Sequence, residues 1–557
     1  MSARTLLTAA VAATAFLTSA FAPPPPPPAG TSDRPTVHAP AGAVQGRAAD
    51  GIESFKGIPY AAPPVGQNRW RPPGPIAAWS GVRDASDYGA ACIQPTPRAP
   101  SIYSSDLGRT SEDCLTLNVW TPAATGPTRT GKAPVMVWIH GGALVAGSSK
   151  EPLYDGAALA KQGIVVVSIN YRLGVLGFLA HPDLSAESPV GISGNYGIMD
   201  QVAALTWVKR NIAAFGGDPD QVTIAGESAG GLSVMYLMAS PIARGLFQRA
   251  IAQSAYMIST PELKEARYGA PSAETAGTTL ARALQAPSLQ VLRSKDAQEL
   301  TDAAAMSGFS PFGAVDGKVL TGQLVDVFAQ GKQAPVPILA GFNSGEIRSL
   351  RVLAPPAPRS AADYEAVIRA RYGDLADEFL RLYPSSDLGE SVLATTRDAL
   401  YGWTSERLVR DQTALGKPSF LYLFDHGYPA ADQAGLHGFH ASELPFMFGN
   451  TGRTTPRWPA IPDTAGEHAL SQAMVGYWAS FVKTGRPEAP GVAPWAPYGT
   501  DEAYMTFKAM PEAGRDLMPG MFDLHRSAVC RRQALNLAWN WNVGVVSPDL
   551  SAGAPGC

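Results

Sequence analysis

The stretch 223-TIAGESAGGLSV-234 places Gly226-Glu227-Ser228-Ala229-Gly230 between two apolar runs. The residues before it predict a short buried strand and those after it a buried helix, so Ser228 stands at a sharp strand-to-helix turn. Such a turn strains the backbone of the serine, and glycines at 226 and 230 remove side chains that would crowd it. The stretch therefore predicts an accessible nucleophilic hydroxyl, although an ordinary tight turn remains an alternative.

The surrounding sequence predicts an α/β fold built on a mostly parallel sheet. Apolar residues at three- and four-residue steps predict an amphipathic helix over 195–214, which Gly216 and Gly217 end. Strands that alternate with helices predict helices on both faces of the sheet. The segment 255–334 is expected to be an excursion from that sheet. Compact apolar runs predict buried strands at 134–139, 164–169, 222–225, 337–341 and 420–424.

Composition and charge restrict the possible partners. The 557 residues are 45% hydrophobic, which suits a large folded core, and we expect one domain over 35–545 with a C-terminal tail at 546–557. The net charge of −3 and the lack of a basic run argue against binding to nucleic acid. No Cys/His spacing suggests a metal site, and no cofactor is expected.

The N-terminus has the pattern of an export signal. Arg4 precedes an Ala-rich apolar segment from Leu6 to Phe21, which is short for a membrane span. We interpret 1–22 as a signal peptide, with cleavage after Ala20 preferred because a cut after Ala22 would place proline next to it. A retained membrane anchor is the alternative. Residues 23–34 then form a Pro-rich tether, and the mature protein is expected to be secreted or periplasmic, without a stable membrane span.

Export makes disulfides chemically plausible for the four cysteines. Sequence proximity favours Cys92 with Cys114. The remaining pair, Cys530 with Cys557, would fix the C-terminal tail, and a free Cys557 is the competing interpretation.

A serine nucleophile needs a base, and the base needs a carboxylate that orients it. In this architecture both partners follow the serine along the chain, the acid before the histidine. Glu346 in 337-PILAGFNSGEIRSL-350 follows a predicted strand. His437 and His440 lie in 435-GLHGFHASELPFMF-448, a loop shortly after the strand at 420–424. On position alone, both histidines are candidates and Glu346 could equally be an ordinary loop residue.

Acyl transfer also needs donors for the negative oxygen of the tetrahedral intermediate. The small residues of 138-WIHGGALVAG-147 would let a substrate oxygen approach the backbone, and the residue after the nucleophile, Ala229, supplies a further N–H group.

With these features in place, the chain resembles the type-B carboxylesterase family of α/β-hydrolases. The resemblance covers most of the chain and includes 55-FKGIPYAAPPVGQNRWRPP-73, 112-EDCLTLNVW-120, the turn at Ser228 and 477-YWASFVKTGRP-487. It implies a triad of Ser228, Glu346 and His440 and an oxyanion hole formed by Gly142, Ala143 and Ala229. It also implies the Cys92–Cys114 disulfide and places Ser254 beside the triad, where we also expect Glu227. Gly345-Glu346-Ile347 departs from the Asp-Glu-Gly that is common in the family.

The resemblance leads us to expect a serine esterase that acts on small carboxylic esters. Tyr103 is the only aromatic residue between Cys92 and Cys114, where cholinesterases have a tryptophan, so neutral esters are favoured over choline esters. Phe309 and Phe312 are candidates for the acyl pocket. A lipase or amidase, or a binding protein without catalysis on the same fold, remain alternatives.

Overall fold

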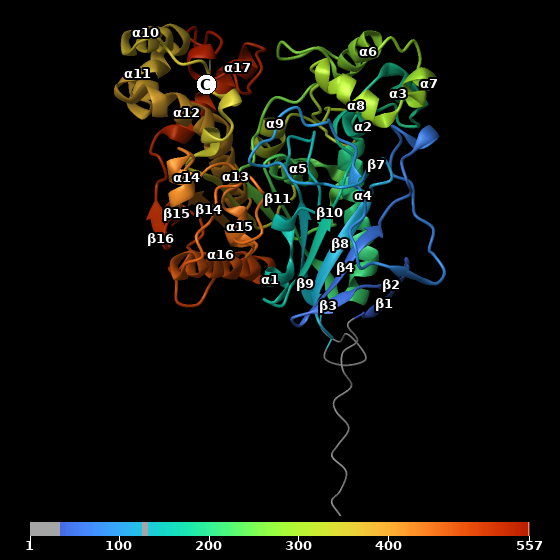
Figure 1. Ribbon diagram of the computed structural model, residues 1–557. Helices are drawn as coiled ribbons and strands as arrows, with labels where there is room; N and C mark the ends of the chain where they lie inside the picture. Colours follow the sequence, from blue (N-terminus) through green and yellow to red (C-terminus); the bar gives the residue numbers. More distant parts are fainter. Residues whose placement is uncertain (1–33, 125–131, 555) are drawn as a thin grey trace, which may run out of the picture.

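The computed structural model describes residues 34–124, 132–554 and 556–557. Within them, the largest sheet has 11 strands in the order β16-β15-β14-β13-β12-β11-β9-β10-β8-β4-β3 (Figure 1). In this spatial order, neighbouring strands from β15 to β10, including β9, pair in parallel. At the two edges, β16 pairs antiparallel with β15, and β8, β4 and β3 continue the sheet from β10 in antiparallel pairs. This confirms the predicted α/β fold with a mostly parallel sheet.

The bounds of the elements agree with the main apolar runs of the sequence. The strands of the large sheet are β3 (Arg47–Ala49), β4 (Ile52–Pro59), β8 (Thr116–Pro122), β9 (Ala133–Ile139), β10 (Val165–Ile169), β11 (Gly217–Glu227), β12 (Arg249–Gln253), β13 (Ile338–Asn343), β14 (Ser419–Phe424), β15 (Ala503–Phe507) and β16 (Pro511–Arg515). Two smaller sheets contain β1 (Thr36–Ala39), β2 (Gly42–Gln45) and β5 (Val82–Asp84), and β6 (Ala91–Cys92) with β7 (Thr110–Ser111).

Helices surround the sheet, and most are short. They are α1 (Ala157–Ala160), α2 (Gly174–Phe178), α3 (Pro182–Glu187), α4 (Tyr196–Asn211), α5 (Ala229–Ala239), α6 (Ala273–Ala283), α7 (Leu289–Ser294), α8 (Ala297–Met306), α9 (Leu324–Ala329), α10 (Ala361–Tyr372), α11 (Ala376–Leu382), α12 (Leu388–Arg397), α13 (Trp403–Ala414), α14 (Pro429–Gln433), α15 (Leu444–Met447), α16 (Ala465–Thr484) and α17 (Met521–Ala534). The short 3-10 helix η5 (Glu346–Arg348) and the short π-helix η9 (Asp398–Gly402) contribute residues to the site described below.

The alternation of side chains along the central strands divides the core into two layers. In β9, Val135, Val137 and Ile139 belong to the core that includes residues of α4, α5 and α13. Met136 and Trp138 point to the opposite core, which α1, α15 and α16 cover. Successive side chains of a strand point to opposite faces, so a strand that is apolar throughout must be covered on both sides.

Two predicted boundaries differ from the structure. β11 begins at Gly217 and not at Val222, and its register with β9 is interrupted between these two residues. The turn residues Gly217-Asp218-Pro219, which suggested a loop, lie in this irregular start of the strand. The helix predicted over 195–214 ends at Asn211 and continues as a 3-10 turn to Phe215, where the left-handed Gly216 stops it.

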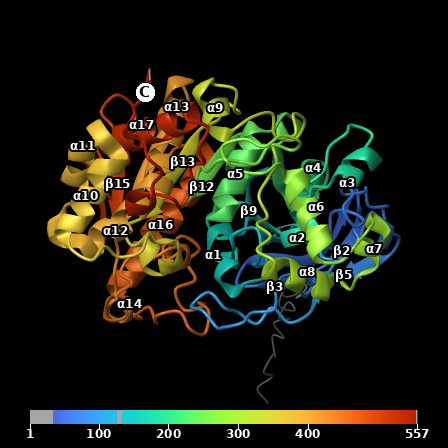
Figure 2. The same cartoon turned by 90° about the horizontal axis from the view of Figure 1, so that it is seen from above.

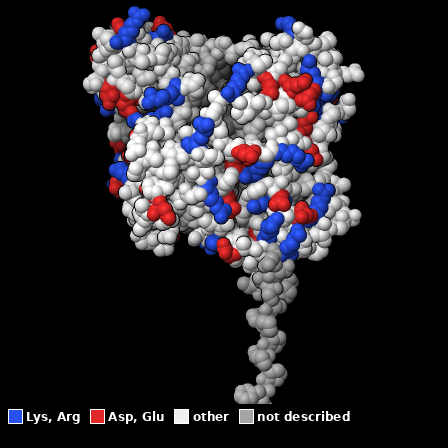
Figure 3. All heavy atoms as spheres, viewed as in Figure 1, with Lys and Arg blue, Asp and Glu red and all other residues white. Residues whose placement is uncertain are grey.

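The candidate functional end of the molecule lies at the carboxyl edge of the parallel strands. Helix α2, which follows β10, lies toward the upper edge in Figure 1, so the parallel strands point that way. Figure 3 shows the surface hollowed at this edge, between the part that carries α10 and α11 and the part that carries α6 and α8. In Figure 2, which looks down on this edge, α6 to α8 lie apart from α10 to α12. The segment 255–334 contains helices α6 to α9 and no strand of the large sheet, as expected for an excursion from that sheet.

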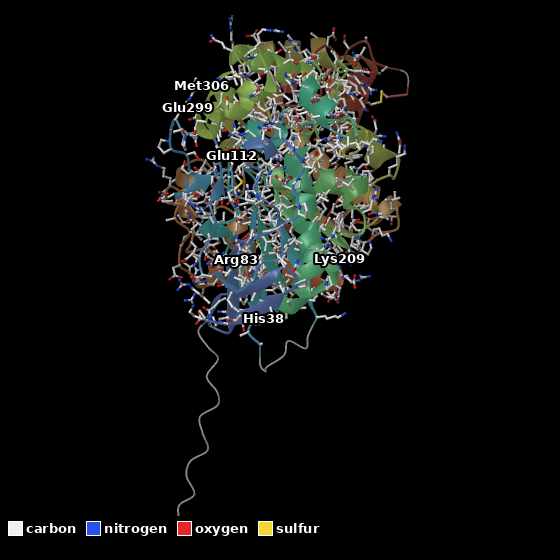
Figure 4. All side chains as sticks on the ribbon, turned by 90° about the vertical axis from the view of Figure 1, so that its right-hand side faces the viewer. His38, Arg83, Glu112, Lys209, Glu299 and Met306 are labelled. Atoms are coloured by element: carbon white, nitrogen blue, oxygen red, sulfur yellow. A yellow bond between two sulfur atoms is a disulfide. The ribbon has the colours of Figure 1, made fainter. Side chains whose placement is uncertain are left out.

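Both predicted disulfides, Cys92–Cys114 and Cys530–Cys557, are present. The first lies beside Glu112, which is labelled in Figure 4, and the second joins α17 to the C-terminal tail. The predicted signal peptide and nearly all of the predicted tether lie outside the described residues. Within the described part of the chain, no helix has the length and apolar character needed to cross a membrane.

Candidate active site

Ser228 occupies the turn between β11 and α5 in a conformation that L-residues rarely adopt. Its φ is 57° and its ψ is −122°, and its backbone N–H donates to Gln253 O at 2.9 Å. A Cβ at Gly230 would lie 2.1 Å from Ile139 O, and one at Gly226 would lie 2.5 Å from Gly230 C. The turn therefore needs glycine at both positions, as the sequence predicted, and it leaves Ser228 partly exposed while its neighbours are buried.

Glu346 and His440 meet although 94 residues separate them. Glu346 Oε2 contacts His440 Nδ1 in a short hydrogen bond, and Glu346 Oε1 accepts the backbone N–H of Asn343 at 2.8 Å. Glu346 is fully buried and His440 is 5% exposed. A carboxylate that is fixed in this way can orient an imidazole and stabilise its protonated form.

The loops after β13 and β14 hold each other in place. Gly345 N–H donates to Gly438 O at 2.8 Å, and Asn343 Nδ2 donates to Phe439 O at the same distance. Gly345 has no room for a side chain, because a Cβ there would lie 2.7 Å from Leu436 O. This close approach brings the acid and the imidazole together at the ends of neighbouring strands.

The other ring nitrogen of His440 faces the residue that precedes Ser228. Nε2 lies 3.0 Å from Glu227 Oε1, although this oxygen makes no hydrogen bond within the described residues, so the contact is electrostatic and poorly aligned. No hydrogen bond joins Nε2 to Ser228 Oγ among the described residues. Catalytic hydrogen bonds are often long until substrate binds.

Buried carboxyl groups set the electrostatics of the site. Burial lowers the pKa of His440, but the neighbouring charges of Glu227 and Glu346 outweigh this effect and raise that pKa to about 9. Burial raises the pKa of Glu227 to about 8, against the attraction of the imidazolium. The two groups are in contact, so they share protonation changes, and Glu227 favours the charged imidazole when it is ionised.

A third buried carboxyl group, on Glu443, connects these loops to β12. It accepts hydrogen bonds from Gln253 Nε2 at 2.9 Å and Asn343 Nδ2 at 2.7 Å, and burial raises its pKa to about 7. Trp478 Nε1 in turn donates to Gln253 Oε1 at 2.9 Å. The role of Glu443 was not predicted from sequence, although this residue lies in 435-GLHGFHASELPFMF-448.

The loop after β9 brings backbone N–H groups without a hydrogen-bond partner in the described part of the chain close to Ser228. Gly142 and Ala143 have φ values of 101° and 57°, and Gly142 O accepts the N–H groups of Val145 and Ala146 at 2.9 Å. The N–H groups of Gly142, Ala143 and Ala229 donate to no other described residue. A Cβ at Gly141 would lie 3.2 Å from Ser228 Cβ, so this loop lies directly against the turn of the nucleophile.

Ser254 lies at the end of β12, with a φ of 44° and its N–H bonded to Gly341 O at 2.8 Å. Its buried hydroxyl has no hydrogen-bond partner within the described residues. The backbone bond places Ser254 at the carboxyl edge of the sheet, one residue beyond Gln253.

The two predicted pocket residues lie in different surroundings. Phe309 packs against a satellite core that includes Leu300 and Ala304 of α8. Phe312 belongs to a series of aromatic rings that leads to the imidazole, with centroid separations of 6.4, 5.5, 6.0 and 5.5 Å. The series runs from Phe312 through Trp541, Tyr256 and Tyr401 to His440. Trp541, Tyr256 and Tyr401 could not be predicted from sequence, because their rings converge only through folding.

The other downstream histidines have different partners. His437 is half-buried, and its ring contacts Asp432 at 2.8 Å and Asp425 at 3.3 Å. His426 pairs with Glu467, His468 with Asp463 and His525 with the hydroxyl of Tyr383. Among the described residues, His440 alone combines contact with Glu346 and proximity to the turn at Ser228.

A mostly parallel sheet, a strained serine between β11 and α5, and a buried Glu–His pair beside it define a hydrolase of the α/β-hydrolase fold. Comparison with known proteins agrees, because the Carboxylesterase family model matches residues 33–519. The chain belongs to the carboxylesterase family and is a carboxylic ester hydrolase.

Similar curated proteins include the fumonisin B1 esterase of Sphingopyxis macrogoltabida, 37% identical over 495 residues that cover 86% of this chain and 87% of the relative. The para-nitrobenzyl esterase of Bacillus subtilis is 38% identical over 471 residues, which cover 82% and 91% of the two chains. Among solved structures, a PNB esterase has a TM-score of 0.75 at 34% identity, and a Geobacillus stearothermophilus carboxylesterase has 0.74 at 34%. Each covers 88% of this chain, and 99% of its own chain is matched.

Proposed function

We propose that the protein hydrolyses small carboxylic esters through a covalent acyl-enzyme on Ser228. The contact between Glu346 and His440, next to the strained turn at Ser228, is the observation that carries this proposal. His440 removes the proton of Ser228 as the hydroxyl attacks the ester carbonyl, and Glu346 orients the imidazole. The N–H groups of Gly142, Ala143 and Ala229 stabilise the oxyanion. The alcohol then leaves, and water releases the acid by the same steps.

The proposed roles can be tested with Ser228→Ala on a chromogenic para-nitrophenyl ester of a short acid. Loss of the nucleophile is expected to lower kcat by about 10⁶-fold, because serine and base act as a unit. Undiminished turnover by the folded variant would exclude the assignment of Ser228.

A second experiment separates the possible substrate classes. Assaying the wild-type protein on a graded series of acyl lengths, from soluble esters to emulsified lipid, distinguishes an esterase from a lipase. Matching amides test for an amidase.

We also propose that the enzyme acts outside the cytoplasm, as one domain over 35–545 whose tail is fixed to it. The signal-like segment at 1–22 supports this proposal, and so do the two disulfides. N-terminal sequencing of the protein recovered from the periplasm or medium of a bacterial host tests it. A new N-terminus near Ala20 or Ala22 is expected, and an unprocessed cytoplasmic chain would contradict the proposal.

The names of the relatives suggest substrates to try first. Two similar proteins are named as esterases of fumonisin B1 and of para-nitrobenzyl esters. We propose a para-nitrobenzyl ester as a screening substrate, because its alcohol is aromatic and the rings of Tyr401 and Tyr103 lie near the imidazole, with centroid distances of 5.5 and 6.5 Å.

A further inference from the structure

The loop between Cys92 and Cys114 reaches the candidate site through the hydroxyl of Tyr103. This hydroxyl lies 2.9 Å from the backbone oxygen of His440 and 2.7 Å from Ser349 Oγ. A phenol has one hydrogen and a carbonyl can only accept, so Tyr103 donates to His440 and accepts from Ser349. Tyr103 thereby joins the disulfide-closed loop to the loop that carries the histidine and to the loop that carries the acid.

The carbonyl that Tyr103 holds lies in a strained part of the histidine loop. It belongs to the peptide that leads into Ala441, whose φ is 67°. A non-glycine residue in this region is stable only when its surroundings fix it. Three successive carbonyl oxygens of the loop accept hydrogen bonds from residues outside it. Gly345 N–H donates to Gly438, Asn343 Nδ2 to Phe439 and the hydroxyl of Tyr103 to His440.

The position of Tyr103 is itself well fixed. Its ring lies edge-on between His440 and Trp458, with centroid distances of 6.5 and 6.0 Å. The neighbouring carbonyl of Ile102 accepts the hydroxyl of Thr455. Burial raises the pKa of the Tyr103 hydroxyl well above its ordinary value, so this hydroxyl keeps the hydrogen that it donates.

The base of the loop is anchored as well. The disulfide joins its two ends, and the buried Arg69 pairs with Glu112 through two contacts of 2.6 Å. Displacement of the loop would therefore be resisted at its base and at Tyr103.

We propose that Tyr103 is a positioning residue that fixes the imidazole of His440 relative to Ser228 through the backbone carbonyl of His440. The proposal rests on the proposed function, because it assumes that His440 is the base. Tyr103 acts on the base and not on the reacting atoms, so it affects the rate of acylation more than the binding of substrate.

The test compares Tyr103→Phe with wild type and with Tyr364→Phe. Tyr364 on α10 provides the matched control, because its hydroxyl also donates to a backbone carbonyl, that of Tyr383, at 2.9 Å. Turnover is expressed per serine that reacts with a fluorophosphonate, so that misfolded molecules are not counted. For Tyr103→Phe we expect kcat and the rate of phosphonylation to fall about tenfold, with KM changed less than about twofold. Tyr364→Phe is expected to keep the wild-type kcat.

Wild-type kcat in Tyr103→Phe would overturn the proposal. Equal losses of kcat in both variants would also overturn it, because they would indicate a general effect on stability. A rise in KM at constant kcat would instead assign Tyr103 to substrate binding. Ser228→Ala is assayed in parallel to distinguish failure of the proposed function from failure of the role of Tyr103. Activity in Ser228→Ala would refute the catalytic roles, independently of the result for Tyr103→Phe.

Discussion

Glu227 places a carboxyl group beside the imidazole that would act as the base. The proximity of Glu227 raises the pKa of His440, and a general base must be neutral before it can take a proton. Activity is therefore expected to rise with pH as His440 loses its proton. Because a buried carboxyl in contact with a histidine can shift its pKa, Glu227 controls where this rise occurs.

The variant Glu227→Gln removes the charge and is expected to move the rise in kcat/KM to lower pH, by about one unit or more. The measurement is a pH profile of kcat/KM for wild type and variant with a neutral ester. Glu467→Gln is the matched control, because Glu467 also contacts a histidine, lying 2.8 Å from His426 outside the site. A rise that stays in place or moves to higher pH in Glu227→Gln would show that Glu227 does not stabilise the protonated imidazole.

At the scale of elements, the site depends on loops that follow β9, β11, β13 and β14, together with one loop that a disulfide closes. Cys92 and Cys114 are 22 residues apart, and Cys530 and Cys557 are 27 apart. Loop-closure entropy changes slowly with length, so the two disulfides should stabilise the fold by similar amounts, about 3 kcal/mol each. Their effects on catalysis should differ, because only the first closes the loop that carries Tyr103.

This expectation can be tested with two double variants, Cys92→Ala with Cys114→Ala and Cys530→Ala with Cys557→Ala. Both should lower Tm, measured by calorimetry in the oxidised state. The first should also lower kcat per reactive serine at 25 °C, whereas the second should not. If both pairs changed kcat alike, the link between the disulfide loop and the histidine loop would be refuted.

At the scale of the whole molecule, buried titratable groups make stability depend on pH. The folded pKa values of Glu227, Glu443 and His440 are raised to about 8, 7 and 9. A group whose pKa is raised by folding loses its contribution as pH rises through the folded value. Burial lowers the pKa of His140 and His525 from 6.5 to about 4. These two histidines therefore make the protein more stable as pH rises, but only up to pH 6.5.

The free energy of unfolding is therefore expected to fall between pH 6.5 and pH 9. In this range Glu227, Glu443 and His440 lose their contributions, and His140 and His525 no longer offset the loss. Each unit of pKa shift corresponds to about 1.4 kcal/mol, so Tm should decrease by about a few degrees over this range. Calorimetry in buffers of low ionisation enthalpy provides the measurement. An increase in Tm over the same range would contradict the assigned pKa directions.

The local parts of this molecule could be predicted from sequence, whereas contacts between distant loops could not. The turn at Ser228 is specified by its own glycines, and the strands at β9, β10, β13 and β14 are continuous apolar runs. The choice of His440 over His437 came from the family resemblance, because both lie in one loop and only packing turns one of them toward Glu346. Glu443, Tyr256 and Tyr401 escaped prediction, since their contacts join different elements that only folding brings together. The irregular start of β11 was missed because Gly217 and Pro219 resemble a turn.

The most direct test of the central claim is intact-mass spectrometry of the wild-type protein after reaction with a fluorophosphonate. We expect one phosphonyl group per chain, located on Ser228 by peptide mapping, and complete loss of activity at one equivalent. Ser228→Ala should remain unlabelled. Labelling at another residue, or full esterase activity in a chain whose Ser228 is fully labelled, would contradict the claim that Ser228 is the nucleophile.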